Sequence, residues 1–186
     1  MLEELVSFAI SWTVFPTALG HAAIAWGEKG VVGVWLPEPD PAAVRRRVAR
    51  RHPSAREMAP PPGIGDAISR ITDLLAGSPA DLTGVPLDLD RVPELHRRVY
   101  AVARSVPSGQ TTTYGEIAAR LGDRSLSREV GRALGANPFP LVVPCHRVLA
   151  AGGKTGGFSA PGGVSTKLRL LEIERARVPG VPTLFR

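Results

Sequence analysis

The chain has 186 residues and 44% hydrophobic residues, enough to bury a core in one large domain or in two small ones that share an interface. Its single cysteine excludes an internal disulfide, no apolar run approaches the roughly 20 residues of a membrane span, and the N-terminus is acidic where a secretory signal would be basic. We therefore expect a cytoplasmic protein with no membrane partner.

The formal net charge of +6 is unevenly distributed. Residues 1–90 contain 8 Lys and Arg against 11 Asp and Glu, for a net charge of −3, whereas residues 91–186 contain 15 against 6, for +9. A polyanion such as a nucleic acid would bind the basic half. Arginine-rich chains are common, however, so the charge alone leaves this open.

The first third of the chain contains three short apolar runs, residues 7–15, 21–26 and 31–37. Glycine and proline punctuate them, which predicts hairpins and a three-stranded antiparallel sheet. All three tryptophans lie here, and we expect them in the core: Trp12, Trp26 and Trp35.

Two helices should follow the sheet. Asp40 is a suitable N-cap with Pro41 at the first helical position, and Val44 and Val48 are spaced for one buried face. The sequence PPPG at 60–63 should break the chain before a second short helix over residues 66–77. These elements form a predicted N-terminal α/β domain of residues 1–90.

The predicted C-terminal domain, residues 91–186, is mainly helical. A helix after Pro93 would bury Leu95, Val99 and Val102. Thr113 and Glu116 have the spacing of a capping box, and a short turn separates their helix from another over residues 126–138. The outline is a helix-turn-helix, and the expected fold class is α/β (α+β): a small antiparallel sheet with helices, followed by a helical domain.

The second of these helices carries small residues that suggest one bare side: Gly131, Ala133, Gly135 and Ala136. Glycine in a helix costs about 1 kcal/mol against alanine, so the small surface should serve a purpose. It would allow either close packing against another helix or close approach to a nucleic acid, with Arg128 and Arg132 supplying charge.

Cys145 lies between a proline and His146, directly after an apolar run. A nearby histidine favours the reactive thiolate, although sequence neighbours point in different directions and a bridging water would be needed where they do not touch. A lone cysteine is more often a small core residue. The residues alone leave both interpretations open.

The wider context carries a family resemblance. PCHRV at 144–148, preceded by GANPFPLV and followed by GGKTGGFS, resembles the active-site signature of the O6-alkylguanine-DNA alkyltransferases, the methylated-DNA:protein-cysteine methyltransferases. The resemblance is strong over residues 93–174 and looser in the N-terminal sheet. It implies a monomer that binds duplex DNA in the minor groove with weak sequence preference, flips out an O6-alkylguanine, and transfers the alkyl group irreversibly to Cys145.

The resemblance also assigns roles to single residues. His146 would act as a base through a water, oriented by the glutamate of a Lys-x-x-Leu-Leu-x-x-Glu pattern, which is Glu174, with Glu172 as the alternative. Tyr114 would donate toward guanine N3, and Arg128 would enter the base stack. The remaining residues would support the turn or line the pocket: Asn137, Pro140, Val148, Gly156, Phe158 and Ser159.

Some features depart from the family pattern or leave rivals open. The segment 158–167 is longer than usual, and the cysteines that bind zinc in some relatives are missing, so we expect neither a metal nor a cofactor. The rivals are a non-catalytic binding protein, a transcriptional regulator and a thiol hydrolase. The range of alkyl groups and any cooperativity along DNA stay open.

Overall fold

The computed structural model describes residues 10–178. Its sheet has the strand order β3-β2-β1-β4, in which β1 (Ser11–Thr17), β2 (Gly20–Gly27) and β3 (Gly30–Glu38) form the two expected antiparallel hairpins. The sheet has four strands rather than the three predicted, because β4 (Arg56–Glu57) pairs in parallel with β1. A two-residue strand is too short to leave a pattern in the sequence. The first predicted run began at residue 7, and residues 7–9 lie outside the described part.

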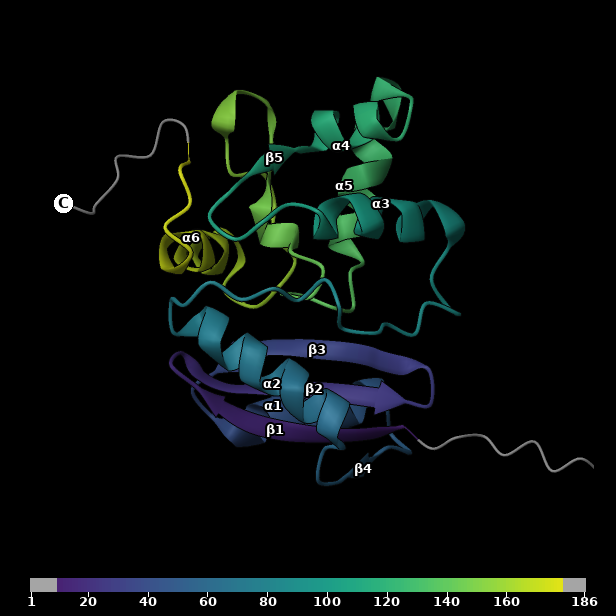
Figure 1. Ribbon diagram of the computed structural model, residues 1–186, viewed down its shortest axis with the longest axis vertical. Helices are drawn as coiled ribbons and strands as arrows, with labels where there is room; N and C mark the ends of the chain where they lie inside the picture. Colours follow the sequence, from purple (N-terminus) through teal and green to yellow (C-terminus); the bar gives the residue numbers. More distant parts are fainter. Residues whose placement is uncertain (1–9, 179–186) are drawn as a thin grey trace, which may run out of the picture.

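The two faces of the sheet are covered by different helices (Figure 1). Helix α1 (Pro41–Arg51) buries Val44 and Val48 against one face, and its N-cap Asp40 accepts a hydrogen bond from the Ala42 amide at 2.9 Å, as predicted. Helix α2 (Pro62–Leu75) packs on the other face. Strand β2 therefore alternates between two cores, as expected for a sheet covered on both sides.

Helix α2 starts earlier than predicted. Its first residue is Pro62, and Gly63 and Gly65 lie inside it, so the prediction that residues 60–63 break the chain was wrong at its second half. Proline lacks only an amide hydrogen that the first helical turn leaves unpaired, and its fixed φ suits that position. The same residue type that stops a helix can thus begin one.

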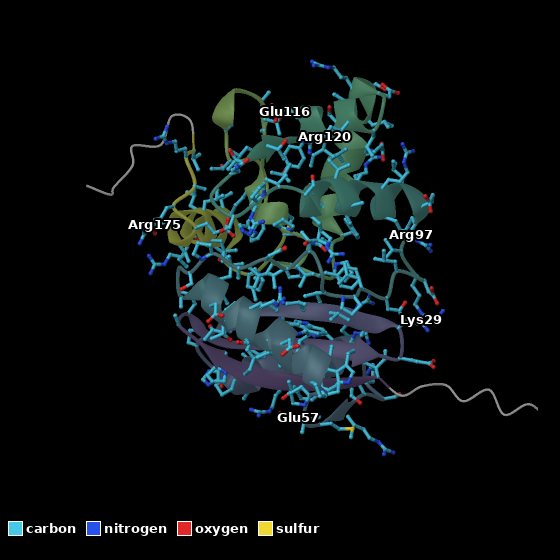
Figure 2. All side chains as sticks on the ribbon, viewed as in Figure 1. Lys29, Glu57, Arg97, Glu116, Arg120 and Arg175 are labelled. Atoms are coloured by element: carbon cyan, nitrogen blue, oxygen red, sulfur yellow. The ribbon has the colours of Figure 1, made fainter. Side chains whose placement is uncertain are left out.

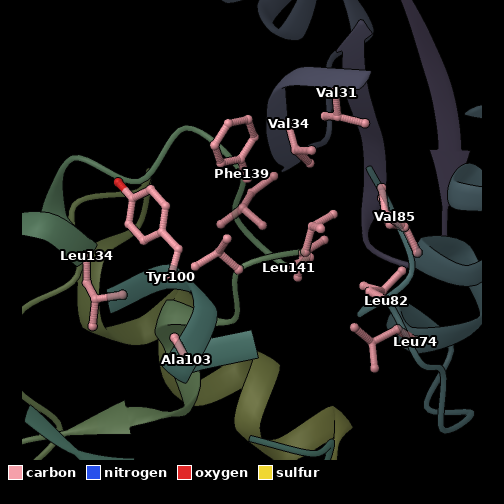
Figure 3. Close-up of a cluster of buried hydrophobic side chains, with 14 of the residues drawn as sticks. Val31, Val34, Leu74, Leu82, Val85, Tyr100, Ala103, Leu134, Phe139 and Leu141 are labelled. Atoms are coloured by element: carbon pink, nitrogen blue, oxygen red, sulfur yellow. The ribbon is translucent and has the colours of Figure 1, made fainter. Parts of the chain in front are cut away.

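The edge strand β3 is largely buried and forms hydrogen bonds with later segments of the chain. The Val34 amide donates to the Pro138 carbonyl at 2.9 Å, and the Val31 amide donates to the Pro86 carbonyl at 2.9 Å. Figure 3 shows Val31 and Val34 in one cluster with Phe139, a residue of the C-terminal half. The main core therefore runs across the predicted domain boundary, and the division at residue 90 remains a proposal.

The C-terminal half is mainly helical. Helices α4 (Tyr114–Arg120) and α5 (Ser127–Gly135) pack together around the short 3-10 turn η1 (Arg124–Leu126), which is the helix-turn-helix outline. The capping box is confirmed: the Glu116 amide donates to Thr113 Oγ1 at 3.1 Å, and the Thr113 amide donates to Glu116 Oε2 at 2.7 Å. Glu116 lies at the opposite end of the molecule from Glu57 (Figure 2). Within residues 10–178, no helix is long and apolar enough to cross a membrane.

Helix α3 (Glu94–Arg104) buries a different set of residues from the one predicted. Val99 is buried as expected, but Tyr100 and Ala103 are buried in place of Leu95 and Val102, which are only half-buried. Tyr100 can be buried because its hydroxyl donates to the Ala133 carbonyl at 2.9 Å. Counting only aliphatic residues shifted the predicted face.

Candidate functional site

Cys145 follows a tight turn after α5. Asn137 holds this turn from both sides, since its Nδ2 donates to the Val143 carbonyl at 2.9 Å and its Oδ1 accepts from the Phe139 amide at 2.9 Å. Leu141 adopts a φ of 74°, a left-handed conformation that costs a non-glycine residue energy and persists only where the surroundings enforce it. The turn ends in the 3-10 helix η2 (Cys145–Arg147), with Cys145 half-buried at its start.

His146 and Glu174 form a buried pair beneath the cysteine. His146 Nε2 donates to Glu174 Oε1 at 2.8 Å, and the two side chains are 1% and 2% exposed. Burial lowers the pKa of His146 and Glu174 only partly opposes this, so the imidazole is neutral near pH 7. In that tautomer Nδ1 has the free lone pair, and it has no hydrogen-bond partner among the described residues. His146 can therefore accept a proton at Nδ1.

Arg147 is the third member of this buried group. Its role was not predicted from the sequence. It binds Glu174 in a bidentate manner, Nε to Oε2 at 2.9 Å and Nη2 to Oε1 at 2.8 Å, and its Nη1 donates to the Val106 carbonyl at 2.6 Å. Burial alone would raise the pKa of Glu174, but the hydrogen bonds and charges of His146 and Arg147 lower it to about 2. Glu174 is thus a permanent anion at neutral pH.

The alternative glutamate faces away from this group. Glu172 accepts from Arg169 Nη1 at 2.9 Å, and both side chains are partly exposed at the surface. The geometry gives Glu174, and not Glu172, the contact with His146. The segment 158–167, predicted to be longer than usual, runs into α6 (Gly163–Ile173). Its extra length does not prevent Glu174 from contacting His146.

The thiol itself is not activated in advance. Burial raises the pKa of Cys145, and this outweighs the opposing effects of a hydrogen bond with Asn137 and the charge of Lys167. The thiol is therefore protonated near pH 7, and a reaction at sulfur needs a base.

Lys167 is the lysine of the Lys-x-x-Leu-Leu-x-x-Glu pattern, but it was predicted to have no role of its own. It is fully buried, its Nζ donates to the Val148 carbonyl at 2.6 Å, and it lies 5.8 Å from the Tyr114 ring centroid. Burial lowers the pKa of Lys167 to about 8, although the negative form of Cys145 would raise it. A signal was available, because Lys167 and Glu174 are spaced i and i+7. Lys167 lies on the buried face of α6 with Leu170 and Leu171, and Glu174 follows at the C-cap of that helix.

A cavity of about 210 Å³ opens beside Cys145. Five of the predicted residues line it: Asn137, Pro140, Cys145, Phe158 and Ser159. Ser159 Oγ also donates to the Gly135 carbonyl at 3.0 Å, which ties the loop after the active-site turn to the end of α5.

Tyr114 and Gly156 lie outside this cavity and contact each other. Gly156 has a φ of 69°, and a Cβ there would lie 3.0 Å from the tyrosine ring, so only glycine allows this close approach. Burial raises the pKa of Tyr114, with a smaller contribution from Cys145 in its negative form. Val148, the last of the predicted pocket residues, is linked to Tyr114 through Lys167.

The exposed face of α5 explains its small residues. A Cβ on Gly131 or Gly135 would meet nothing within 4 Å, so no described helix packs there. Ala133 is buried in the core, and its assignment to the bare side was wrong. Arg128 is exposed in the first turn of the same helix. Close packing against another described helix therefore does not explain Gly131 and Gly135.

Known proteins resemble this chain over most of its length. Residues 94–176 match the family model described as "6-O-methylguanine DNA methyltransferase, DNA binding domain". A methylated-DNA–protein-cysteine methyltransferase of Methanothermobacter thermautotrophicus is 38% identical over 157 residues, which cover 84% of this chain and 81% of that protein. This chain belongs to the methylated-DNA–protein-cysteine methyltransferase family. A Mycobacterium tuberculosis relative of the same name is 39% identical over 135 residues, 72% of this chain and 79% of its own length.

Solved structures show the likeness over nearly the whole chain. The crystal structure of the Mycobacterium tuberculosis O6-methylguanine methyltransferase has a TM-score of 0.70 and 30% identity, covering 95% of this chain and 99% of that one. A structure of the same relative in complex with DNA matches equally well. The mixed α and β fold inferred from the sequence is confirmed.

Proposed function

We propose that this protein is a direct-reversal DNA repair protein that transfers the alkyl group of an O6-alkylguanine in duplex DNA to Cys145. The observation that carries the proposal is the arrangement around the thiol: a protonated cysteine beside a cavity, followed by a neutral histidine that an ionised glutamate orients. A thioether does not revert, so each molecule acts once.

The chemistry follows from the geometry of the pair. His146 Nδ1 takes the thiol proton through a bridging water, while Glu174 stabilises the resulting imidazolium. The sulfur attacks the carbon bound to O6, a C–S bond forms, and the C–O bond breaks with its electron pair going to guanine. Tyr114 donates a proton toward N3 of the leaving base. Tyr114 regains its proton from water, and the His146 imidazolium returns to water the proton that it took from the thiol. The net change moves the thiol proton to guanine, so the step balances without a cofactor.

The pocket residues would orient the flipped base. The carbonyls of Cys145 and Val148 accept from the guanine amino group, and the Val148 oxygen has a second lone pair besides the one that Lys167 uses. The Ser159 amide binds O6. Pro140 and Phe158 form the walls around the alkyl group.

Helix α5 would dock in the minor groove. Its bare face at Gly131 and Gly135 permits close approach to the sugar-phosphate backbone, and Arg128 would fill the gap that the flipped guanine leaves. Contacts of this kind read little sequence, so we propose weak sequence preference. We also propose that the protein binds DNA as a monomer. We place the protein in the cytoplasm, because a reactive free thiol needs a reducing compartment.

The test is the intact mass of the protein after mixing with a duplex that contains O6-methylguanine. We expect a stable gain of one methyl group, located on Cys145, and none in Cys145→Ala. The variant should still bind the duplex, because phosphate contacts dominate affinity. Methyl transfer by Cys145→Ala would refute the nucleophile, and binding without any mass gain in the native protein would indicate a non-catalytic recognition protein.

A further inference from the structure

The cavity beside Cys145 continues beyond the family's pocket residues into the N-terminal half. Its opposite wall consists of the β3 segment 32–36 and of three residues at the end of α1, namely Arg47, Arg51 and His52. None of these wall residues is among those that the family resemblance places in the pocket. The cavity forms where the edge strand β3 meets the active-site turn through the bond from Val34 to Pro138.

The wall is apolar near the sheet. Trp35 lies over Gly33, where a Cβ would be 2.8 Å from its ring, and meets His52 edge-on with the ring centroids 5.9 Å apart. Pro140 and Phe158 face it from the other half. The volume of about 210 Å³ exceeds the roughly 150 Å³ of an engineered cavity that binds benzene. The compartment therefore has room for a group much larger than methyl.

The outer end of the wall is cationic. Arg47 is neutralised by Glu38, with Nη1 and Oε1 2.6 Å apart. Burial lowers the pKa of His52, as do the charges of Arg51 and Arg91, so the imidazole is neutral near pH 7. Arg51 is exposed and forms no hydrogen bond or ion pair with the described residues. Among the cavity-lining residues within 10–178, Arg51 is therefore the one that carries a charge without an opposite charge bound to it.

We infer that this compartment receives the far end of large O6 substituents and that Arg51 favours those that end in a carboxylate. The inference rests on the proposed function, because Cys145 marks where the transferred carbon would lie. An apolar segment of the substituent would pass between Trp35 and Phe158, and its terminal anion would meet the guanidinium at the mouth. Arg51 is a specificity-determining residue in this assignment and takes no part in the bond changes.

The experiment compares two free-base substrates, O6-(4-carboxybenzyl)guanine and its uncharged analogue O6-(4-carbamoylbenzyl)guanine. The measured quantity is the ratio of their rate constants for alkylation of Cys145, determined for the native protein, Arg51→Gln and Arg51→Glu. Intrinsic reactivity cancels when the ratios are compared between proteins. We expect Arg51→Gln to lower the carboxylate-to-amide ratio about fivefold, the size expected of a solvent-exposed ion pair, and Arg51→Glu to lower it further.

Arg50→Gln is the matched control, because Arg50 is an exposed arginine of the same helix that does not line the cavity. Its ratio should equal that of the native protein. An unchanged ratio in Arg51→Gln would overturn the inference even if Cys145 is alkylated. Slower methyl transfer from duplex DNA in Arg51→Gln, with the ratio unchanged, would overturn it in favour of a phosphate contact. Absence of alkylation by every substrate, the methylated duplex included, would instead refute the proposed function.

Discussion

Charged side chains on the two sides of Cys145 differ in whether they have partners within the protein. On the buried side, Arg147 and Glu174 are paired with each other, and the Lys167 ammonium binds a backbone carbonyl. On the side of α5, Arg128 is exposed and Gly131 borders open space. The buried charges have partners within the protein, whereas Arg128, on the surface proposed to meet DNA, forms no ion pair with the described residues.

Glu174→Gln should cause the largest change. It leaves the buried Arg147 without its counter-ion, so we expect the free energy of unfolding to fall by about 3–5 kcal/mol in urea denaturation. Methyl transfer should slow as well, since the amide cannot stabilise an imidazolium. The control Glu172→Gln, at the surface beside Arg169, should stay within about 0.5 kcal/mol of the native protein. Equal losses in the two variants would remove the distinction between the buried and exposed carboxylates.

Acid should reveal the same pair. The pKa of Glu174 is about 2 in the folded protein against an ordinary value of 4.5, so its contribution to stability is present above pH 4.5 and is lost as the pH falls toward 2. That contribution is roughly 3 kcal/mol. Unfolding free energies measured across this window should therefore depend less steeply on pH in Glu174→Gln than in the native protein. Parallel pH profiles would contradict the depressed pKa.

Arg128→Ala tests the exposed side. If Arg128 fills the space of the flipped base, its loss should slow transfer from duplex DNA about tenfold, equivalent to roughly 1.4 kcal/mol, and leave transfer from free O6-benzylguanine unchanged. Rates should be measured at saturating duplex. Arg132→Ala removes the same charge one turn later, from a pair with Glu129, and should not slow the bound complex. Equal losses on both substrates would mean that Arg128 supports the fold.

Gly131→Ala should have the smallest effect, and its two parts have opposite signs. Because a Cβ at Gly131 meets nothing, alanine should raise the free energy of unfolding by about 0.5–1 kcal/mol through its helix propensity. The same methyl group should weaken duplex binding severalfold if the helix approaches DNA closely. Gly65→Ala, equally open but in α2, should raise stability without changing DNA affinity. Unaltered binding by Gly131→Ala would argue against docking through this face.

Features that depend on neighbouring residues could be predicted from the sequence. The Asp40 N-cap and the Thr113–Glu116 capping box are bonds between groups two or three residues apart, so spacing alone predicts them. The hairpins follow from turn residues between apolar runs. The family resemblance of the Pro-Cys-His-Arg signature predicted Cys145 as the nucleophile and Glu174 as the partner of His146, with Glu172 as the alternative.

Other features depend on contacts between segments that are far apart in the chain, so no single stretch of sequence predicts them. From its sequence context Arg147 would be taken for a surface residue. Its partners in the fold, Glu174 and the Val106 carbonyl, are 27 and 41 residues away along the chain. Arg51 lines the same cavity as Cys145 only because the edge of β3 joins the active-site turn. The pattern of one segment reports which of its faces is apolar, but a buried charge is tolerated only where another segment supplies its partner, and that information lies in the packing.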